Sequence, residues 1–136
     1  MKSIVVPVVI DSLQTIDEFI NAELEACGCS SKTRYQVEVA IEEVVVNIVS
    51  YSQLPVDAGF EVRCEVLQDP TRLVVQILDG GVPFDPLAKP DPDMSPEALQ
   101  NRIGGLGIYM VKQMMDDAAY AYEDGKNVLT ITKILG

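Results

Sequence analysis

Two polar residues four positions apart, Glu43 and Asn47, have side chains suited to proton transfer and metal binding. A glutamate carboxylate can accept a proton from an attacking hydroxyl or water. An asparagine carbonyl oxygen can bind Mg²⁺, which takes few protein ligands and keeps several waters. Residues i and i+4 are neighbours on a helix, so the two would lie together if this segment is helical. Alone the pair is a weak signal, because such residues on a helix flank are usually only solvated.

An aspartate at the end of an apolar run is the second candidate. Leu73, Val75, Ile77 and Asp79 alternate along this run, so Asp79 lies on the same face as three apolar residues. A carboxylate that points into an apolar pocket is costly unless it meets a donor, and the amino group of adenine is a suitable one. Gly81 would let a flat ring approach the backbone. The alternative is an ordinary Gly-Gly turn with a local hydrogen bond from the aspartate.

A glycine cluster before an apolar helix is the third candidate. The segment Gly104-Gly105-Leu106-Gly107 would place free backbone N–H groups at a helix start, where a phosphate can bind. Arg102 and Lys112 flank it and would offset some negative charge. It lacks the Lys-Ser/Thr end of a Walker A motif, and Met110 occupies the third glycine position of G-x-G-x-x-G. Alone, this signal is also weak.

The charge balance limits the partners and the chemistry. Ten Lys and Arg against 21 Asp and Glu give a formal net charge of −11, whereas binding to nucleic acid needs a basic face. The chain has no His, which excludes a Ser-His-Asp triad and phosphorylation of a His within this chain. We therefore expect no direct nucleic-acid binding, and a carboxylate as the natural general base.

Length and composition predict one globular domain over residues 1–136, since 48% of the residues are hydrophobic and can form a core. Cys27, Cys29 and Cys64 lack the spacing of a disulfide framework and favour reduced thiols in the cytoplasm. Without a His, they also form a poor zinc site. The apolar start of the chain is interrupted by Pro7 and stopped by Asp11, so we expect neither a membrane span nor a signal peptide.

Hydrophobic periodicity indicates the elements that must position the three candidates. Pro7 favours an edge strand, Asp11 or Ser12 can cap the first helix, and Gly28 can end it. In chain order, the predicted elements are a strand at 3–10, helices at 12–27 and from Ser30 or Ser31 to about 52, strands at 60–66 and 72–79, a helix at 106–115, and strands at 118–123 and 127–135. This order predicts an α+β two-layer sandwich with a mixed, mostly antiparallel sheet of about five strands and three helices on one face.

The second helix separates two adjacent glutamates. Its expected core face is formed by Val37, Ala40, Ile41, Val44 and Ile48. Glu43 falls on one flank of that face with Asn47, and Glu42 falls on the opposite flank near Glu38. Helix geometry therefore selects Glu43 over Glu42 as the candidate base.

Together, the three segments resemble the N, G1 and G2 boxes of the Bergerat-fold ATPases. The segments are Glu43 to Asn47, Asp79 to Pro86 and Gly104 to Lys112. The likeness is greatest to the stand-alone anti-sigma factor serine/threonine kinases, because the string D-x-G-x-P-F-D-P and the G-G-L-G helix start are typical of that branch. The resemblance runs from residue 3 to about residue 135.

The resemblance implies a role for each matching residue. Glu43 matches the general base, Asn47 the Mg²⁺ ligand, and Asp79 the aspartate that binds the adenine amino group. The further ATP contacts are Gly81, Pro83, Arg102, Gly104, Gly105, Leu106 and Gly107. The Pro-rich residues at about 87–103 match the ATP lid.

Two positions depart from the family pattern. The family often has a His or a Lys three residues after the asparagine, and here that residue is Ser50. The Gly-Thr near the start of the last strand is replaced by Lys126-Asn127. We therefore assign no adenine contact to that strand.

The resemblance implies an ATP- and Mg²⁺-dependent kinase that phosphorylates a Ser or Thr of an anti-sigma antagonist protein and can also bind a sigma factor. Homodimers are usual in this branch, and Val74 and Leu78 on the second face of their strand would suit a covered surface. The alternative is a nucleotide-dependent protein-binding switch without kinase activity. The catalytic domain of a histidine kinase would need a His-bearing helical hairpin, which this chain lacks, so it could act only in trans. Because the chain is acidic, we expect nucleotide binding to depend strongly on Mg²⁺.

Overall fold

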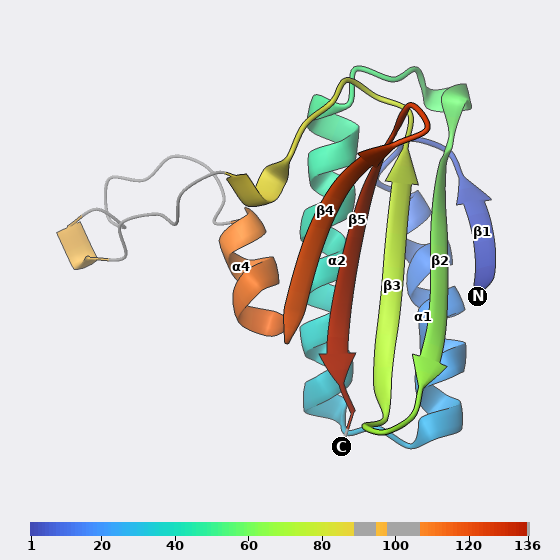
Figure 1. The fold of residues 1–136 in the computed structure, drawn as a ribbon, viewed down its shortest axis with the longest axis vertical. Helices are drawn as coiled ribbons and strands as arrows, with labels where there is room; N and C mark the ends of the chain where they lie inside the picture. The colour runs from blue at the N-terminus through green and yellow to red at the C-terminus, as the bar shows by residue number, and fades with distance from the viewer. Residues whose placement is uncertain (89–94, 98–106, 136) are drawn as a thin grey trace.

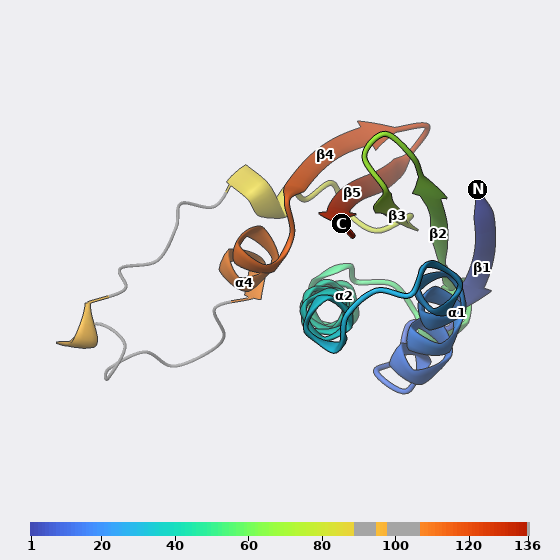
Figure 2. The ribbon, with the colours of Figure 1, turned by 90° about the horizontal axis from the view of Figure 1, so that it is seen from below.

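Five strands form one sheet, and the helices of the described part of the chain pack on one of its faces (Figures 1 and 2). The structure, a computed structural model, describes residues 1–88, 95–97 and 107–135. The strands are β1 (Lys2–Val6), β2 (Phe60–Leu67), β3 (Arg72–Asp79), β4 (Asp117–Glu123) and β5 (Lys126–Ile134). The helical segments are α1 (Ser12–Cys27), α2 (Ser31–Tyr51), α4 (Gly107–Met114) and the short 3-10 turns η1 (Val56–Ala58) and η2 (Pro86–Ala88).

The order of the strands across the sheet is β1-β2-β3-β5-β4. Every pairing among the described strands is antiparallel, so the sheet is not mixed. The two-layer α+β sandwich and the order of its elements are confirmed. None of the helices in the described ranges is both long and apolar enough to cross a membrane.

The first strand and first helix differ in detail from the prediction. The strand ends at Val6 instead of residue 10, because Pro7 has no N–H to continue the ladder. The Ser12 hydroxyl donates to the Pro7 carbonyl (2.7 Å), and the Asp11 side chain forms no capping hydrogen bond. Neither predicted cap is therefore used. Gly28 ends the helix in a left-handed conformation, as predicted (φ 66°).

Helix α2 packs on the sheet through a continuous apolar stripe. The Ser30 side chain caps its start by accepting from the Thr33 backbone N–H (3.1 Å). Its buried residues are Val37, Ala40, Ile41, Val44, Val45 and Ile48. The stripe meets the inward-facing apolar residues of β2, β3 and β5 in one core, and it confirms the core face predicted for this helix.

One apolar residue on the face of the sheet that lies away from the helices is largely covered within the chain. Leu78 points away from the helices, yet only 7% of its surface is exposed. Its neighbours across the strands are Glu61 on β2 and Val128 on β5. Leu78 is therefore largely covered within one chain, whereas Val74 is half-buried.

Three carboxylates gather between α1 and α2. Burial raises the pKa of Asp17 from 3.8 to about 6, and the negative charges of Glu38 and Glu42 add to the effect. Asn21 donates to Glu38 across the same interface (3.2 Å). The unfolded chain loses the Asp17 proton at a lower pH than the folded chain, so this group lowers the free energy of unfolding as the pH rises from about 4 to about 6.

Replacing Asp17 by Asn should therefore stabilise the protein. The change in pKa corresponds to about 3 kcal/mol without screening, and solvent around this half-buried group reduces it to about 1 kcal/mol. We expect Asp17→Asn to raise the free energy of unfolding by that amount at pH 7.5 and by less at pH 5, measured by urea denaturation. Glu18→Gln removes an equal charge from the exposed side of α1 and should have little effect. Equal effects of the two variants would contradict the prediction.

Candidate functional site

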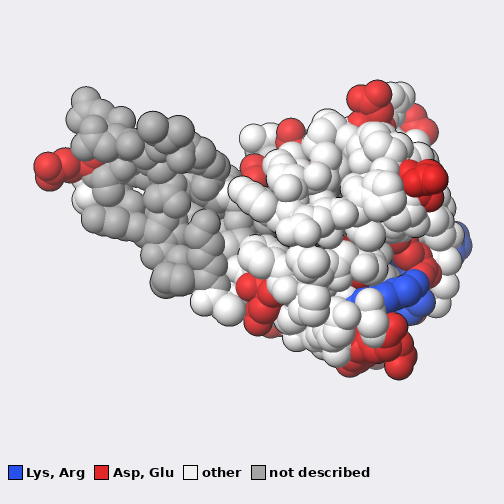
Figure 3. Space-filling view, turned by 90° about the horizontal axis from the view of Figure 1, so that it is seen from above, with Lys and Arg blue, Asp and Glu red and all other residues white. Residues whose placement is uncertain are grey.

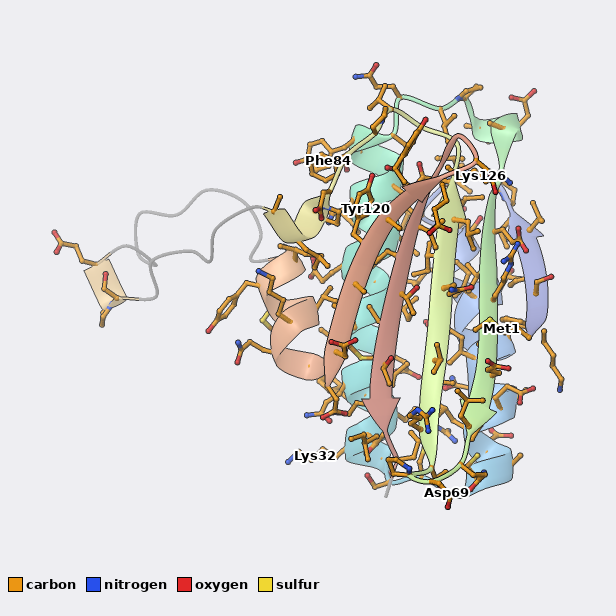
Figure 4. All side chains as sticks on the ribbon, in the orientation of Figure 1. Met1, Lys32, Asp69, Phe84, Tyr120 and Lys126 are labelled. Carbon is orange, nitrogen blue, oxygen red and sulfur yellow. The ribbon has the colours of Figure 1, made fainter. Side chains whose placement is uncertain are left out.

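A pocket of about 480 Å³, including its open mouth, lies at the C-terminal end of α2, beside the end of β3 and the start of β5. Largely apolar walls are typical of pockets that bind small molecules. Figure 4 shows Phe84 and Tyr120 at this end of the sheet, beside α2. The lining residues are Val44, Asn47, Ile48, Tyr51, Ser52, Ile77, Asp79, Val82, Phe84, Pro86, Tyr120, Asn127 and Leu129. Two of the predicted site residues, Asn47 and Asp79, thus line one pocket.

Asp79 is held by two donors on one of its oxygens. It is 8% exposed, and its Oδ1 accepts from the Gly81 backbone N–H (2.9 Å) and from Nδ2 of Asn127 (3.1 Å). Its second oxygen, Oδ2, accepts none of the hydrogen bonds formed among the described residues. The predicted local hydrogen bond and the predicted pocket position therefore coexist, and one oxygen is left for a ligand.

Asn127 is the site residue that the sequence analysis missed. It lies directly opposite Asp79 in the register of β3 and β5, and it is 7% exposed. The signal was present in the sequence, because Asn127 shares the alternation of Leu129 and Ile131, which both face the core. A buried polar residue in such a row needs partners, and these lie at the end of β3, in the turn after β3 and on β4.

The turn after β3 packs closely on the end of α2. A Cβ on Gly81 would lie 2.6 Å from the Ser52 carbonyl oxygen and 2.9 Å from Oδ1 of Asp79. The Val82 N–H donates to the same Ser52 carbonyl (3.4 Å). Gly81 and Pro83 are not among the lining residues of the pocket. In this structure, therefore, the missing side chain of Gly81 lets the turn after β3 pack closely against the backbone at Ser52.

Glu43, Asn47 and Gly107 meet where α2 passes the start of α4. A Cβ on Gly107 would lie 3.4 Å from Oε2 of Glu43 and 3.8 Å from Oδ1 of Asn47. Burial, and then the neighbouring Glu42, raises the pKa of Glu43 above its usual value, so its carboxylate is a stronger base than a solvated one. Glu42 is exposed on the α1 side, so α2 does separate the two glutamates as predicted.

The remaining predicted residues divide into two groups. Gly104, Gly105, Leu106, Arg102 and most of the predicted lid at 87–103 lie outside the described residues. Ser50, at the position where the family often has a His or Lys, is exposed.

Among the described residues, few positive charges lie at the pocket end of the molecule (Figure 3). Figure 3 views this end from above and shows acidic side chains at several places around its rim, with basic side chains visible only toward one side. Within the described residues, the start of α4 at Gly107 supplies the partial positive charge of a helix N-terminus beside Glu43 and Asn47. An anionic ligand at this end thus approaches a face with several acidic side chains at its rim (Figure 3).

The contact between Gly81 and α2 predicts a difference between two adjacent glycines. Gly81→Ala would press a Cβ into the Ser52 backbone, and we expect it to lower the free energy of unfolding by about 1–3 kcal/mol. A Cβ on Gly80 meets nothing within 4 Å, so Gly80→Ala should change stability by less than about 0.5 kcal/mol. Urea denaturation of both variants tests this, and equal losses would refute the packing role.

Comparison with known proteins bears on the family. Residues 6–133 match the model of the histidine kinase-like ATPase domain. Serine-protein kinase RsbW of Listeria monocytogenes serotype 4a is 30% identical over 107 residues, which cover 75% of this chain and 67% of that protein. Serine/threonine-protein kinase BtrW of Bordetella bronchiseptica is 25% identical over 103 residues, which cover 76% of this chain and 72% of that protein.

A solved structure shares the fold. The crystal structure of the RsbU and RsbW domains of Rv1364c from Mycobacterium tuberculosis matches with a TM-score of 0.70 and 17% identity. The match covers 98% of this chain and 32% of that chain, so the present chain spans about a third of that protein. The sequence matches confirm the resemblance at the level of the family. This chain belongs to the family of histidine kinase-like ATPase domains.

Proposed function

We propose that this protein is an anti-sigma regulatory factor that transfers the γ-phosphoryl group of ATP to a Ser or Thr of a partner protein. One observation carries the proposal: Asn47 and Asp79 line the same pocket, and Glu43 lies one helical turn from Asn47. The pocket thus offers a hydrogen-bond acceptor, Asp79, for the purine base of a nucleotide at one end and a metal ligand, Asn47, at the other. The relatives that share most of the chain are named as protein kinases for serine or threonine.

The residues present fit ATP and Mg²⁺. The apolar walls suit a purine ring, and Oδ2 of Asp79 is available to its amino group. Asn47 would hold Mg²⁺ through its amide oxygen, a ligand type that the ion accepts. When bound, Mg²⁺ would neutralise charge on the phosphates. Gly107, with Gly104, Gly105, Leu106 and Arg102 before it, would contact the phosphates.

Glu43 has the position and basicity of a general base. In the proposed reaction its carboxylate accepts the proton of the Ser or Thr hydroxyl. The hydroxyl oxygen forms a bond to the γ-phosphorus, the bond to the bridging oxygen breaks, and ADP leaves with that electron pair. Phosphoryl transfer needs mainly positioning and charge neutralisation, so one base and few ligands suffice.

The partner proposed from the resemblance is an anti-sigma antagonist protein, with a sigma factor as a second partner. The net charge of −11 supports a partner with a basic contact surface. The free thiols of Cys27, Cys29 and Cys64 support a cytoplasmic location. A homodimer stays a prediction, and size-exclusion chromatography with light scattering tests it.

Asp79→Asn tests the nucleotide site. The Asn oxygen can keep the two internal hydrogen bonds, while its NH₂ group replaces Oδ2 and opposes the amino group of adenine. At 100 times its Kd, ATP with Mg²⁺ should stabilise the parent by about 2.7 kcal/mol. We expect Asp79→Asn to weaken ATP binding at least about ten-fold, and EDTA to remove most of the parent's stabilisation. Thermal unfolding with and without nucleotide measures both, and no stabilisation of the parent at millimolar ATP would sink the proposed function.

Glu43→Gln tests the chemistry, with Glu42→Gln as its matched control on the opposite flank of α2. Glu43→Gln removes the proton acceptor and should lower the rate of phosphoryl transfer by about 10²- to 10⁴-fold with little change in ATP affinity. Glu42→Gln should transfer at nearly the parent rate. Radiolabel transfer from ATP to a candidate antagonist gives the rates. Equal rates of Glu43→Gln and the parent would show that the base is another group, and ATP binding without transfer to any partner would favour the binding switch.

A further inference from the structure

Asn127 joins three strands and a turn through one buried amide. Its Nδ2 donates to Oδ1 of Asp79 (3.1 Å) and to the Val82 carbonyl (2.9 Å). Its Oδ1 accepts from the Phe84 backbone N–H (3.0 Å) and from the Tyr120 hydroxyl. An amide group has two donor and two acceptor positions, so every hydrogen-bonding position of this side chain is used.

The partners determine which way the amide faces. The Val82 carbonyl can only accept, and the Phe84 N–H can only donate, so the nitrogen must lie on the side of Val82 and Asp79. Burial raises the pKa of the Tyr120 hydroxyl, which keeps this group protonated as a donor. The orientation of the Asn127 amide is therefore fixed by the chemistry of its neighbours.

This orientation in turn fixes the carboxylate of Asp79. Oδ1 receives one hydrogen bond from the turn, at Gly81, and one from β5, at Asn127. Two donors from different segments hold the plane of the carboxylate and leave Oδ2 free of both. The same amide holds Val82 and Phe84, which line the pocket beside Asp79.

We propose that Asn127 is a positioning residue that sets the base preference of this pocket. By holding Asp79 and the Val82–Phe84 wall together, it directs Oδ2 at a purine ring that carries an exocyclic amino group. The inference rests on the proposed nucleotide binding. It gives a role to the last strand, to which the departure of Lys126-Asn127 from the family's Gly-Thr had assigned no adenine contact.

The test compares two nucleotides that differ only in the amino group. The Kd values of ATP and of purine riboside triphosphate, which has hydrogen at position 6, are measured by calorimetry. The parent should bind ATP about ten-fold tighter or more, the worth of a hydrogen bond to a charged acceptor. Asn127→Asp keeps the size and the accepting oxygen but replaces the donor with an oxygen that repels Asp79. We expect its two Kd values to lie within about two-fold of each other.

Two further variants complete the test. Thr130→Val lies on the same strand and loses a hydrogen bond to Gln76 on the open face, so it should keep the parent ratio. Tyr120→Phe removes one donor from Asn127 and should lower the ratio about two- to five-fold. If circular dichroism shows that Asn127→Asp does not fold, the ratio of the two Kd values in Tyr120→Phe decides whether Asn127 positions Asp79.

The outcomes separate this inference from the proposed function. A purely structural role of Asn127 would weaken both nucleotides equally, and an unchanged ratio in a folded variant overturns the inference while the function stands. A parent that binds neither nucleotide overturns the proposed function and this inference with it. A parent that binds both equally overturns the base contact of Asp79 and the role of Asn127 together.

Discussion

The packing of α2 on the sheet is the constraint on which the site depends. Each Val or Ile that its apolar stripe buries contributes about 1.5–3 kcal/mol relative to an exposed side chain. The contributions of all the buried residues of α2 together far exceed the cost of about 1 kcal/mol from the carboxylates at the α1 interface. The stripe therefore fixes the rotation of the helix about its axis. Once the rotation is fixed, Glu42 must face α1, and Glu43 and Asn47 must face the start of α4.

The negative charge of the protein makes this rotation important for binding. A chain with a net charge of −11 gives little general attraction to an anionic nucleotide. Favourable charge must come from a few fixed places, and the start of α4 beside Glu43 and Asn47 is one of them. A carboxylate also lies there, so in the proposed function a cation such as Mg²⁺ is needed to bring phosphates close. The apolar walls at the other end of the pocket supply binding that does not depend on charge.

Much of the fold follows from periodicity in the sequence. The spacing of apolar residues gave α1 and α2 nearly to the residue, and alternation placed Asp79 on the inner face of β3. The first strand is shorter than predicted because Pro7 cannot continue the ladder. The predicted cap at Ser12 is wrong because its hydroxyl donates to the nearby Pro7 carbonyl. Leu78 was expected to suit a covered surface, and it is largely buried within the chain. The pocket partners of Asp79 were missed because the register of β3 and β5 is a property of the fold.

The two ends of the site, the Asp79–Asn127 end and the Glu43–Asn47 end, differ in how much their residues contribute to the stability of the fold. At the base end, the buried amide of Asn127 costs free energy unless each of its partners is in place. A substitution of Tyr120, Gly81 or Asp79 should therefore change both the stability of the fold and the shape of the pocket. At the phosphate end, Glu43 and Asn47 are only half-buried on the flank of α2 and contribute little to the core. Substitutions of Glu43 or Asn47 would therefore change the proposed chemistry with little loss of stability, whereas substitutions among Asn127 and its partners would change both.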